Sequence, residues 1–442
     1  MVSIVLSAAL IELQGASDPA VEGPFTAGSQ TVSVPGMEGA NLSTDVYYPR
    51  DTNGLIPAAA APCPVIVLGH GFAQSKAQHV NQGRHFATRG FITLIPNFNA
   101  GSDHSRNADE LRKCLDWIVA HNSDGASVFY QKVQTNRIGA TGHSAGGLSA
   151  IVAASRDPRI RALAPMDPVD SGNLGVNALG NVKVPIAITY SERSACNANG
   201  SAEILFAAAG APKRGMKIVG ANHTDPQDPP GLLSILTCGS ANSSRQLLYR
   251  RYVTGWFEYY LRGDAAYLGW IFNFQGGPLA TDLAAGRVTY SYFGLSVPLD
   301  DWRLLQFGTA ATNAAVAGEL ADPDLDELPN FVEYALNLNP WQSSTDTGVR
   351  SLLIFTNGVK HAALRFPCRQ DASDISYRVE SGTNLIDWQT AAVYSGTNRF
   401  LNTNEVTEVS REGGGWQQVV VRDVFPVGAA LGRFLRLQIT KP

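Results

Sequence analysis

Two hydrophobic patterns divide the chain. Between about residues 65 and 262, short continuous apolar runs alternate with segments whose apolar residues recur at helical spacing. Continuous apolar runs are typical of strands buried on both faces of a parallel sheet, and helical spacing predicts helices that cover such a sheet. This part therefore predicts an α/β domain with a mostly parallel sheet covered by helices on both faces. We expect its strands at residues 65–68, 91–95, 138–141, 162–166, 185–190 and 216–219, with two lead-in strands within 30–48.

The pattern changes after residue 264. Residues 265–320 are rich in glycine and aromatic residues and are either the last part of the first domain or a linker. Residues 321–340 form an acidic segment followed by a helical pattern. Residues 345–442 contain short alternating strands separated by turn residues, which predicts a small all-β, sandwich-like domain. The first domain is expected to span residues 20–264.

Composition excludes several classes of partner. The chain has 442 residues, a hydrophobic content of 44% and a net charge of -4 without a basic run. Neither a nucleic-acid groove nor a polybasic membrane patch is expected. No apolar run approaches the ~20 residues of a membrane span, so we expect no integral membrane segment. These features leave the oligomeric state open.

The N-terminal segment and the cysteines bear on localisation. Residues 2–13 have the length and composition of a signal-peptide core, but no basic residue precedes them and Glu12 interrupts them. They are either an incomplete signal or an ordinary strand or helix. The five cysteines form no C-x-x-C pair, which argues against a zinc site. Cys196 and Cys238 lie in loop-like segments and could form a disulfide, whereas Cys114 falls on the apolar face of a helix and is expected to be a buried thiol.

A candidate nucleophile lies at the centre of the α/β pattern. Residues 136–147 read NRIGATGHSAGG, in which a short strand leads through Gly-His-Ser-Ala-Gly into a helix. In this context G-x-S-x-G predicts a strained elbow that exposes Ser144, with glycines where neighbouring backbone leaves no room for a Cβ atom. The amide of Ala145, at the start of the new helix, is expected to point at an oxyanion.

A serine nucleophile requires a base, and the base requires a carboxylate that fixes its tautomer. His223 is the only histidine between residues 143 and 361, and it follows the strand predicted at 216–219. Two acids remain open. Asp167 follows the strand after the elbow helix and is held before a proline, whereas Glu192 follows the next strand. We favour Asp167, with Glu192 as the alternative.

The turn after the strand at residues 65–68 reads Gly-His-Gly-Phe. Its glycines allow the backbone to approach a substrate, and the amide of Phe72 is the second candidate oxyanion donor. Phe72, His143 and Val169 are expected to line the substrate site. The alternative for the turn is an ordinary strand-to-helix connection.

A second candidate site lies in the acidic segment. Counting Asp322 as position 1, acidic and amide residues occupy positions 1, 3, 5, 9 and 12, the ligand spacing of an EF-hand-type calcium loop. Position 6, normally glycine, is Glu327, and prolines stand at 323 and 329. The segment is therefore either a structural calcium site or a solvated acidic linker. The candidate ligands are Asp322, Asp324, Asp326, Asn330 and Glu333.

With these residues identified, the first 264 residues resemble the α/β-hydrolase family, in the branch of bacterial cutinases and polyester (PET) hydrolases, platelet-activating-factor acetylhydrolases and chlorophyllases. The resemblance rests on the segments GPFTAGSQTVSV, VYYP, HGF, GHSAGG and RALAPMDPVD. It implies Ser144 as nucleophile, His223 as base and the amides of Phe72 and Ala145 as oxyanion hole. The segment from residue 321 on resembles the calcium-loop-plus-β modules of secreted bacterial enzymes, which implies export.

Two departures from the cutinase pattern bear on the acid and the substrate. Cutinase-like enzymes take the acid after the strand at 185–190, where this chain has Glu192, and they carry an aromatic clamp where this chain has Val169. Chlorophyllases and acetylhydrolases take the acid one strand earlier, and MDPVD is similar to their version. The departures therefore favour Asp167 and weaken a specific claim of polyester cleavage.

We expect a secreted or periplasmic serine carboxylesterase that acts through an acyl-enzyme without a catalytic cofactor. No long lid insertion is visible, so an open cleft for polymeric or lipid esters is expected. The alternatives are a lipid-type esterase, a catalytically silent binding protein of the same fold, and an enzyme that cleaves an amide or a C–C bond with the same residues.

Overall fold

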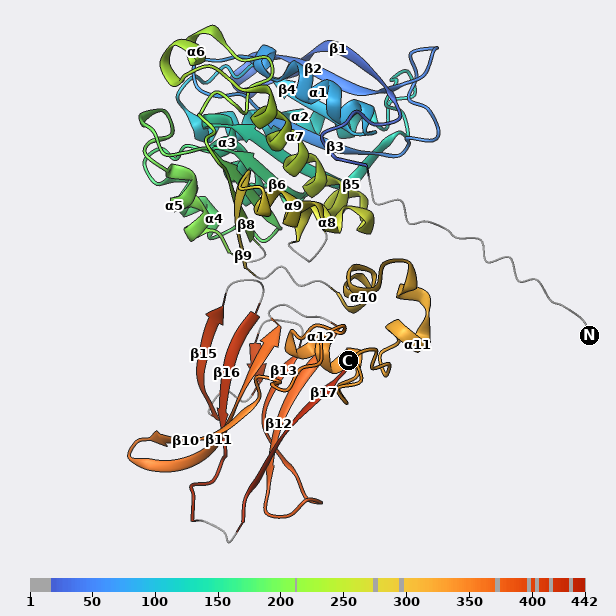
Figure 1. The fold of residues 1–442 in the computed structure, drawn as a ribbon. Helices are drawn as coiled ribbons and strands as arrows, with labels where there is room; N and C mark the ends of the chain where they lie inside the picture. Colours follow the sequence, from blue (N-terminus) through green and yellow to red (C-terminus); the bar gives the residue numbers. More distant parts are fainter. Residues whose placement is uncertain are drawn as a thin grey trace, which may run out of the picture. The chain divides into compact units, whose positions relative to one another are not determined.

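The structure is a computed structural model that describes residues 17–210, 213–272, 277–293, 298–369, 374–395, 399–401, 405–412, 416–428 and 432–441. The chain forms two compact units, which meet in sequence between residues 291 and 292 (Figure 1). The signal-like segment at residues 2–13 lies outside the described residues.

A nine-stranded sheet forms the centre of the N-terminal unit. Strands β4, β3, β5, β6, β7 and β8 run parallel to one another, and β1 and β2 add an antiparallel edge, as the pattern predicts. In spatial order the strands are β1 (Thr26–Pro35), β2 (Asn41–Arg50), β4 (Ile92–Pro96), β3 (Cys63–Gly69), β5 (Val133–His143), β6 (Ile160–Met166), β7 (Ile186–Tyr190), β8 (Lys213–Ile218) and β9 (Val288–Phe293). In parallel sheets, functional residues gather beyond the carboxyl ends of the strands.

Helices cover both faces of this sheet (Figure 1). Helices α2 (His104–His121) and α3 (Ala145–Arg156) share an apolar core with one face. Helices α1 (Val80–Thr88) and α7 (Ser243–Phe257) pack against the other face, where the rings of Phe86 and Phe257 meet. The remaining helices are α4 (Leu174–Leu179), α5 (Ser201–Ala208), α6 (Leu232–Cys238), α8 (Leu268–Ile271) and α9 (Pro278–Ala284), and a π-helix at Glu258–Arg262 continues α7.

The segment at residues 265–320 is divided between the two units. Its first part contributes α8, α9 and strand β9, and the side chains of Leu279 and Val288 are buried. Its second part contains α10 (Leu299–Phe307) and α11 (Ala314–Ala317), and Trp302 belongs to the core of the C-terminal unit. Because each part buries apolar side chains in its own unit, this segment is not a linker, and the domain boundary lies later than residue 264.

Two four-stranded antiparallel sheets share one core in the C-terminal unit. The core includes Phe366 and Val419 from one sheet and Tyr377 and Tyr394 from the other. The first sheet contains β10 (Arg350–Thr356), β11 (Val359–Arg369), β16 (Trp416–Arg422) and β15 (Val406–Glu412). The second contains β14 (Arg399–Leu401), β13 (Gln389–Ser395), β12 (Ser376–Gly382) and β17 (Phe434–Thr440). Helix α12 (Asn330–Leu336) follows the acidic segment.

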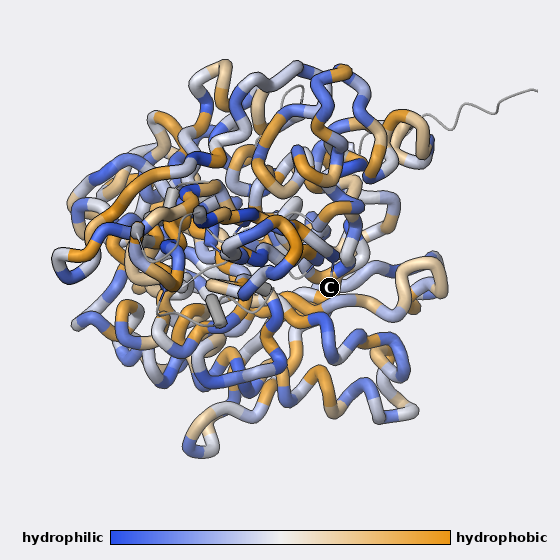
Figure 2. Tube along the Cα trace, turned by 90° about the horizontal axis from the view of Figure 1, so that it is seen from below, coloured by the Kyte–Doolittle hydropathy of each residue, from blue (hydrophilic) through white to orange (hydrophobic). Residues whose placement is uncertain are grey.

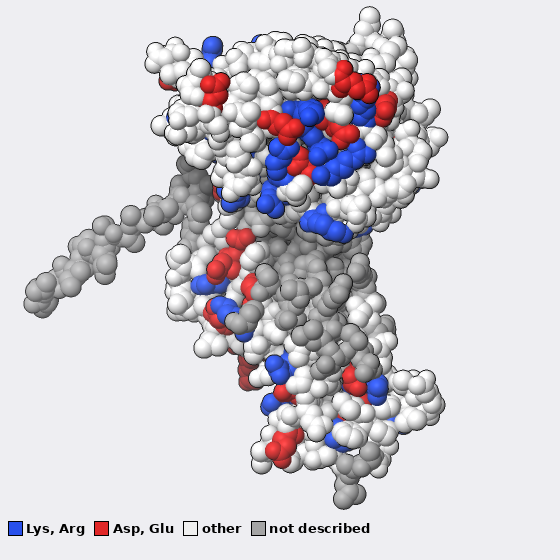
Figure 3. Space-filling view, turned by 180° about the vertical axis from the view of Figure 1, so that it is seen from behind, with Lys and Arg blue, Asp and Glu red and all other residues white. Residues whose placement is uncertain are grey.

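Neither the hydrophobic residues nor the charged residues of the described chain form a long segment of one kind. Hydrophobic and hydrophilic residues alternate over short distances (Figure 2), and among the described residues no helix has the length and apolar character needed to cross a membrane. Basic and acidic side chains gather in one area of the N-terminal unit (Figure 3). Between α2, α3 and the following turn, Arg156 pairs with Asp109 at 3.2 Å and Arg159 pairs with Asp116 at 2.8 Å. In these two pairs, opposite charges lie close enough to neutralise one another.

Candidate active site

Ser144 occupies a strained turn between β5 and α3. Its φ of 55° and ψ of -120° are unusual for a residue other than glycine. A Cβ atom on Gly142 would lie 2.5 Å from the backbone of Gly146, and one on Gly146 would lie 2.2 Å from the carbonyl oxygen of Gly69. The glycines on either side of the serine are therefore required by close backbone packing, as the sequence pattern indicates.

A hydrogen-bonded chain runs from Ser144 through His223 to Asp167. His223 Nε2 lies 2.9 Å from Ser144 Oγ, and His223 Nδ1 lies 2.7 Å from Asp167 Oδ2. The three residues follow β5, β8 and β6, so the carboxyl ends of three strands position them. Asp167 is fully buried, whereas Ser144 and His223 retain 9% and 7% exposure. This arrangement can transfer the serine proton to the imidazole while the buried carboxylate holds the ring.

Two further side chains hold the carboxylate of Asp167. Ser191 donates its hydroxyl to Asp167 Oδ2 at 2.5 Å and its backbone amide to Oδ1 at 3.3 Å. Asn197 donates from Nδ2 to Ser191 Oγ at 3.0 Å and approaches Asp167 Oδ2 at 3.5 Å. Sequence reasoning missed both residues. Ser191 directly follows β7, so its position at a strand end was the available signal, whereas no signal pointed to Asn197.

The alternative acid has other partners. Glu192 accepts hydrogen bonds from Lys217 Nζ at 3.1 Å and from the amide of Gly220 at 3.0 Å. The hydrogen bond from the Gly220 amide, and to a smaller extent that from Lys217, holds the pKa of Glu192 below its usual value. Both partners lie on or just beyond β8. The structure therefore does not bring this carboxylate to His223.

The candidate oxyanion donors line one small cavity. Ala145 is the first residue of α3, so its amide has no partner within the helix. The cavity has a volume of about 120 Å³ and is lined by His70, Gly71, Phe72, Ala73, Gln74, Phe98, Gly101, Asn107 and Ala145. The structure thus places Phe72 and Ala145 beside the same space, and 61% of Phe72 is exposed.

His70 fixes the shape of this loop. Its Nε2 accepts a hydrogen bond from the amide of Phe98 at 3.1 Å, which requires the proton on Nδ1, where the carbonyl of Gly71 accepts it at 2.8 Å. Burial lowers the pKa of His70, which favours this neutral form. The loop that carries Phe72 is therefore anchored to the end of β4.

The other expected substrate residues differ in exposure. The amide of Val169 donates to the carbonyl of Ser144 at 3.3 Å, and its side chain is half-buried beside the nucleophile. His143 is fully buried, and its ring lies 4.6 Å from that of His223 and 6.2 Å from that of His79. Burial lowers the pKa of His143 far below its usual value. Because His143 has no exposed surface, it packs behind His223 and does not line the open site.

Helix α6 has exposed leucines close to the loop that carries Phe72. Gln74 in that loop donates to Ser234 Oγ in α6 at 2.9 Å. The neighbouring side chains of Leu232, Leu233 and Leu236 are 73%, 57% and 75% exposed. A disulfide between Cys196 and Cys238, as the sequence allowed, joins the end of α6 to the loop that contains Asn197. An apolar surface therefore adjoins the site.

The acidic residues of the second candidate site lie in the C-terminal unit. The carboxylates of Asp322, Asp324 and Asp326 gather within 4.8 Å of one another. Asn330 and Glu333 lie in α12 directly after this loop.

Cys63, Cys114 and Cys368 are buried free thiols, as expected for Cys114.

Comparisons with known proteins point to ester hydrolases. A family model described as PET hydrolase-like matches residues 14–234. Cutinase 2 of Thermobifida cellulosilytica is 27% identical over 147 residues, which cover 33% of this chain and 52% of the relative. Bis(hydroxyethyl) terephthalate hydrolase of Streptomyces coelicolor is 26% identical over 178 residues, which cover 38% and 54%. The chain thus spans about half the length of these curated relatives.

Proposed function

Because the chain belongs to the PET hydrolase-like family, we propose that it is a serine carboxylesterase that cleaves bulky apolar esters through an acyl-enzyme intermediate. The observation that carries the proposal is the continuous chain of hydrogen bonds Ser144–His223–Asp167. Its geometry supports a nucleophile, a general base and a carboxylate that orients the base.

The proposed reaction has two halves. His223 Nε2 takes the proton of Ser144 Oγ as that oxygen attacks the ester carbonyl, and the amides of Phe72 and Ala145 stabilise the resulting oxyanion. His223 then returns the proton to the leaving alcohol. In the second half, His223 activates a water molecule that hydrolyses the acyl-Ser144 ester, while Asp167 stabilises the imidazolium in both halves.

The surface near the nucleophile supports an apolar substrate. The side chains of Phe72 and of three α6 leucines (232, 233 and 236) are largely exposed. Exposing apolar groups of this size to water costs free energy, and such a patch is typical of a surface that binds an apolar partner. Such a surface suits an aromatic polyester or a long acyl chain, so a cutinase-like polyesterase is our first candidate and a lipid-type esterase the second. The Cys196–Cys238 disulfide supports export, because disulfides persist in oxidising compartments.

The assignment of the acid is tested by p-nitrophenyl butyrate hydrolysis with matched carboxylate variants. Asp167→Asn should lower kcat by about 10⁴-fold, because the amide favours the wrong imidazole tautomer. Ser144→Ala should lower kcat by roughly 10⁶-fold. Glu192→Gln is the control and should retain wild-type kcat, since Glu192 contacts Lys217 and Gly220. An inactive Glu192→Gln beside an active Asp167→Asn would reverse the assignment.

The same assay, with substrates of different size, separates the candidate functions. Turnover of bis(hydroxyethyl) terephthalate comparable to that of p-nitrophenyl butyrate would support the polyesterase hypothesis. A marked preference for p-nitrophenyl palmitate would support the hypothesis of a lipid-type esterase. If no ester is cleaved and a fluorophosphonate does not label Ser144, the protein is a binding protein instead.

A further inference from the structure

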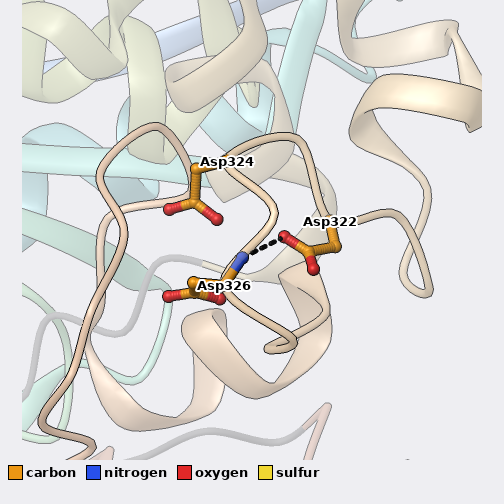
Figure 4. A group of neighbouring side chains, drawn as sticks. All are labelled: Asp322, Asp324 and Asp326. Atoms are coloured by element: carbon orange, nitrogen blue, oxygen red, sulfur yellow. Dashed lines mark hydrogen bonds between the residues drawn. The ribbon is translucent and has the colours of Figure 1, made fainter.

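The acidic loop before α12 gathers carboxylates around one point. Asp322, Asp324 and Asp326 each contribute an oxygen to a group in which all the oxygens lie within 4.8 Å of one another. The three side chains surround the same turn of the loop (Figure 4). Like charges at this distance repel one another unless a cation or protons compensate them.

Glu333 supplies an independent observation. It lies in the first turn of α12, its side chain is fully buried, and neither carboxylate oxygen has a hydrogen-bond partner in the described structure. The charges that act on its carboxyl group are those of Asp324, Asp326 and Asp322, so this group faces the cluster. A buried carboxylate without a partner is costly, and a bound cation would remove that cost.

Asn330 is held in a way that leaves its amide oxygen available. Its Nδ2 donates to the carbonyls of Val316 at 2.9 Å and Gly318 at 2.8 Å. The side chain is buried, and its Oδ1 has no partner among the described residues. Both oxygens of Asp324 are likewise unpartnered. The loop and the start of α12 therefore contain several unused oxygen acceptors.

Position 6 of the loop has the backbone conformation of a calcium loop, although its residue is not glycine. Glu327 has a φ of 71°, the left-handed conformation that glycine normally supplies there. The carboxylate of Asp322 accepts hydrogen bonds from the amides of Asp326 at 3.2 Å and Glu327 at 2.9 Å, which hold the turn. Pro329 directly precedes α12, where its lack of an N–H is tolerated. The residue types at these positions are unusual, but the loop keeps a ligand-compatible shape.

The donor set selects the kind of cation. All the candidate ligand atoms are oxygens, and four of the residues are carboxylates without a Lys or Arg partner among the ion pairs of the described residues. Oxygen ligands suit Ca²⁺ and Mg²⁺ rather than softer transition metals. Six to eight ligands in a flexible loop with a glutamate at position 12 suit Ca²⁺, because Mg²⁺ demands compact octahedral geometry.

The geometry points to a structural Ca²⁺ site formed by Asp322, Asp324, Asp326 and Glu333, with Asn330 as a supporting oxygen donor. This site lies outside the PET hydrolase-like match and outside the hydrolytic unit. It joins the acidic loop to α12, and Tyr334 and Ala335 of that helix belong to the core of the C-terminal unit. Calcium binding is therefore coupled to the folding of this unit.

Calorimetry on the full-length protein tests the site. After metal removal, titration with CaCl₂ should show one bound ion per chain. At Ca²⁺ concentrations about a hundredfold above Kd, the melting temperature of one transition should rise by roughly 5–10 °C. MgCl₂ should produce a much smaller shift. An absent response to millimolar Ca²⁺ would overturn the site, and an equal response to Mg²⁺ would overturn the choice of cation.

Glu333→Gln distinguishes a ligand from a residue with a merely structural role. In EGTA this variant should melt above wild type, because it replaces a buried carboxyl group that has no hydrogen-bond partner and that repels the neighbouring aspartates whenever it is charged. In Ca²⁺ it should melt below wild type, because it lacks a ligand. Glu327→Gln is the matched control in the same loop and should keep the full Ca²⁺ response. A Glu333→Gln protein with an undiminished Ca²⁺ response would refute the assignment.

Discussion

The carboxylate of Asp167 is held by more than its histidine. Its Oδ2 accepts from both His223 and Ser191, and Asn197 secures the Ser191 hydroxyl at 3.0 Å. Asp167 itself has a φ of 43°, a costly conformation that surrounding contacts must maintain. Charge-assisted hydrogen bonds of this kind fix geometry as well as contributing energy. We therefore regard Ser191 as a positioning residue for the proposed reaction.

Ser191→Ala should lower kcat for p-nitrophenyl butyrate by roughly 10-fold, because one charge-assisted hydrogen bond to Asp167 is lost. KM should change little, since Ser191 is buried behind the acid. Ser191→Thr retains the hydroxyl and should recover most of the activity. Ser171→Ala, at an exposed position four residues after Asp167 in sequence, is the control. If Ser191→Ala has wild-type kcat, the hydroxyl does not position the acid.

At the scale of elements, α1 and the short helix before it contain buried histidines. His79 is hydrogen-bonded through Nδ1 to Gln82, and His85 donates from Nε2 to the carbonyl of Pro19 at 2.8 Å. Burial is the main cause that lowers the pKa of His79 to about 4 and that of His85 to about 3, from an ordinary 6.5. Near His85, the charges of Arg250 and Arg89 also lower its pKa, whereas Asp18 raises it. The packing of α1 thus depends on neutral imidazoles.

Acid should destabilise the N-terminal unit through these histidines. Between pH 6.5 and about 4 the unfolded chain binds protons that the folded protein does not, so stability falls as the pH falls. Each histidine should contribute a loss of roughly 1.4 kcal/mol per pH unit within its window. Urea unfolding at pH 7, 6 and 5 measures this slope, which should be smaller in His79→Gln and His85→Gln. Equal slopes in wild type and both variants would contradict the prediction.

At the scale of the whole molecule, each unit has its own core. The N-terminal unit contains all the residues assigned to hydrolysis, and the C-terminal unit contains the proposed calcium site. In sequence, the last residue of the proposed triad, His223, precedes the first proposed calcium ligand, Asp322, by 99 positions (322 − 223). We therefore expect the N-terminal unit to provide the hydrolytic activity and the C-terminal unit to provide the response to Ca²⁺.

A chain of residues 17–293 should fold and hydrolyse p-nitrophenyl butyrate with the kcat of the full protein, because it retains the complete nine-stranded sheet. Its melting temperature should not respond to Ca²⁺. Circular dichroism checks folding, and the steady-state assay checks activity. A shorter chain that ends at residue 264 lacks α8, α9 and β9 and should be unstable. A folded but inactive 17–293 protein would show that the C-terminal unit contributes to catalysis.

Much of this protein follows from local sequence. The strand-turn-helix around Ser144 and the spacing of the acidic loop are readable because neighbouring residues determine the backbone there. The strands of the parallel sheet are readable because each is a continuous apolar run. The segments β13 to β15 are not predicted by the sequence, because their apolar and polar residues alternate irregularly, although each pairs with a strand adjacent in sequence.

Tertiary structure decided what depends on distant contacts. Asp167 and Glu192 both follow parallel strands, and only the packed sheet shows which carboxylate meets His223. The burial of His143 likewise depends on residues far away in sequence, since the rings of His79 and His223 lie beside it. The physical reason is the same in each case. Backbone conformation and hydrophobic periodicity are local properties, whereas hydrogen-bond partners and desolvation are set by the residues that folding brings together.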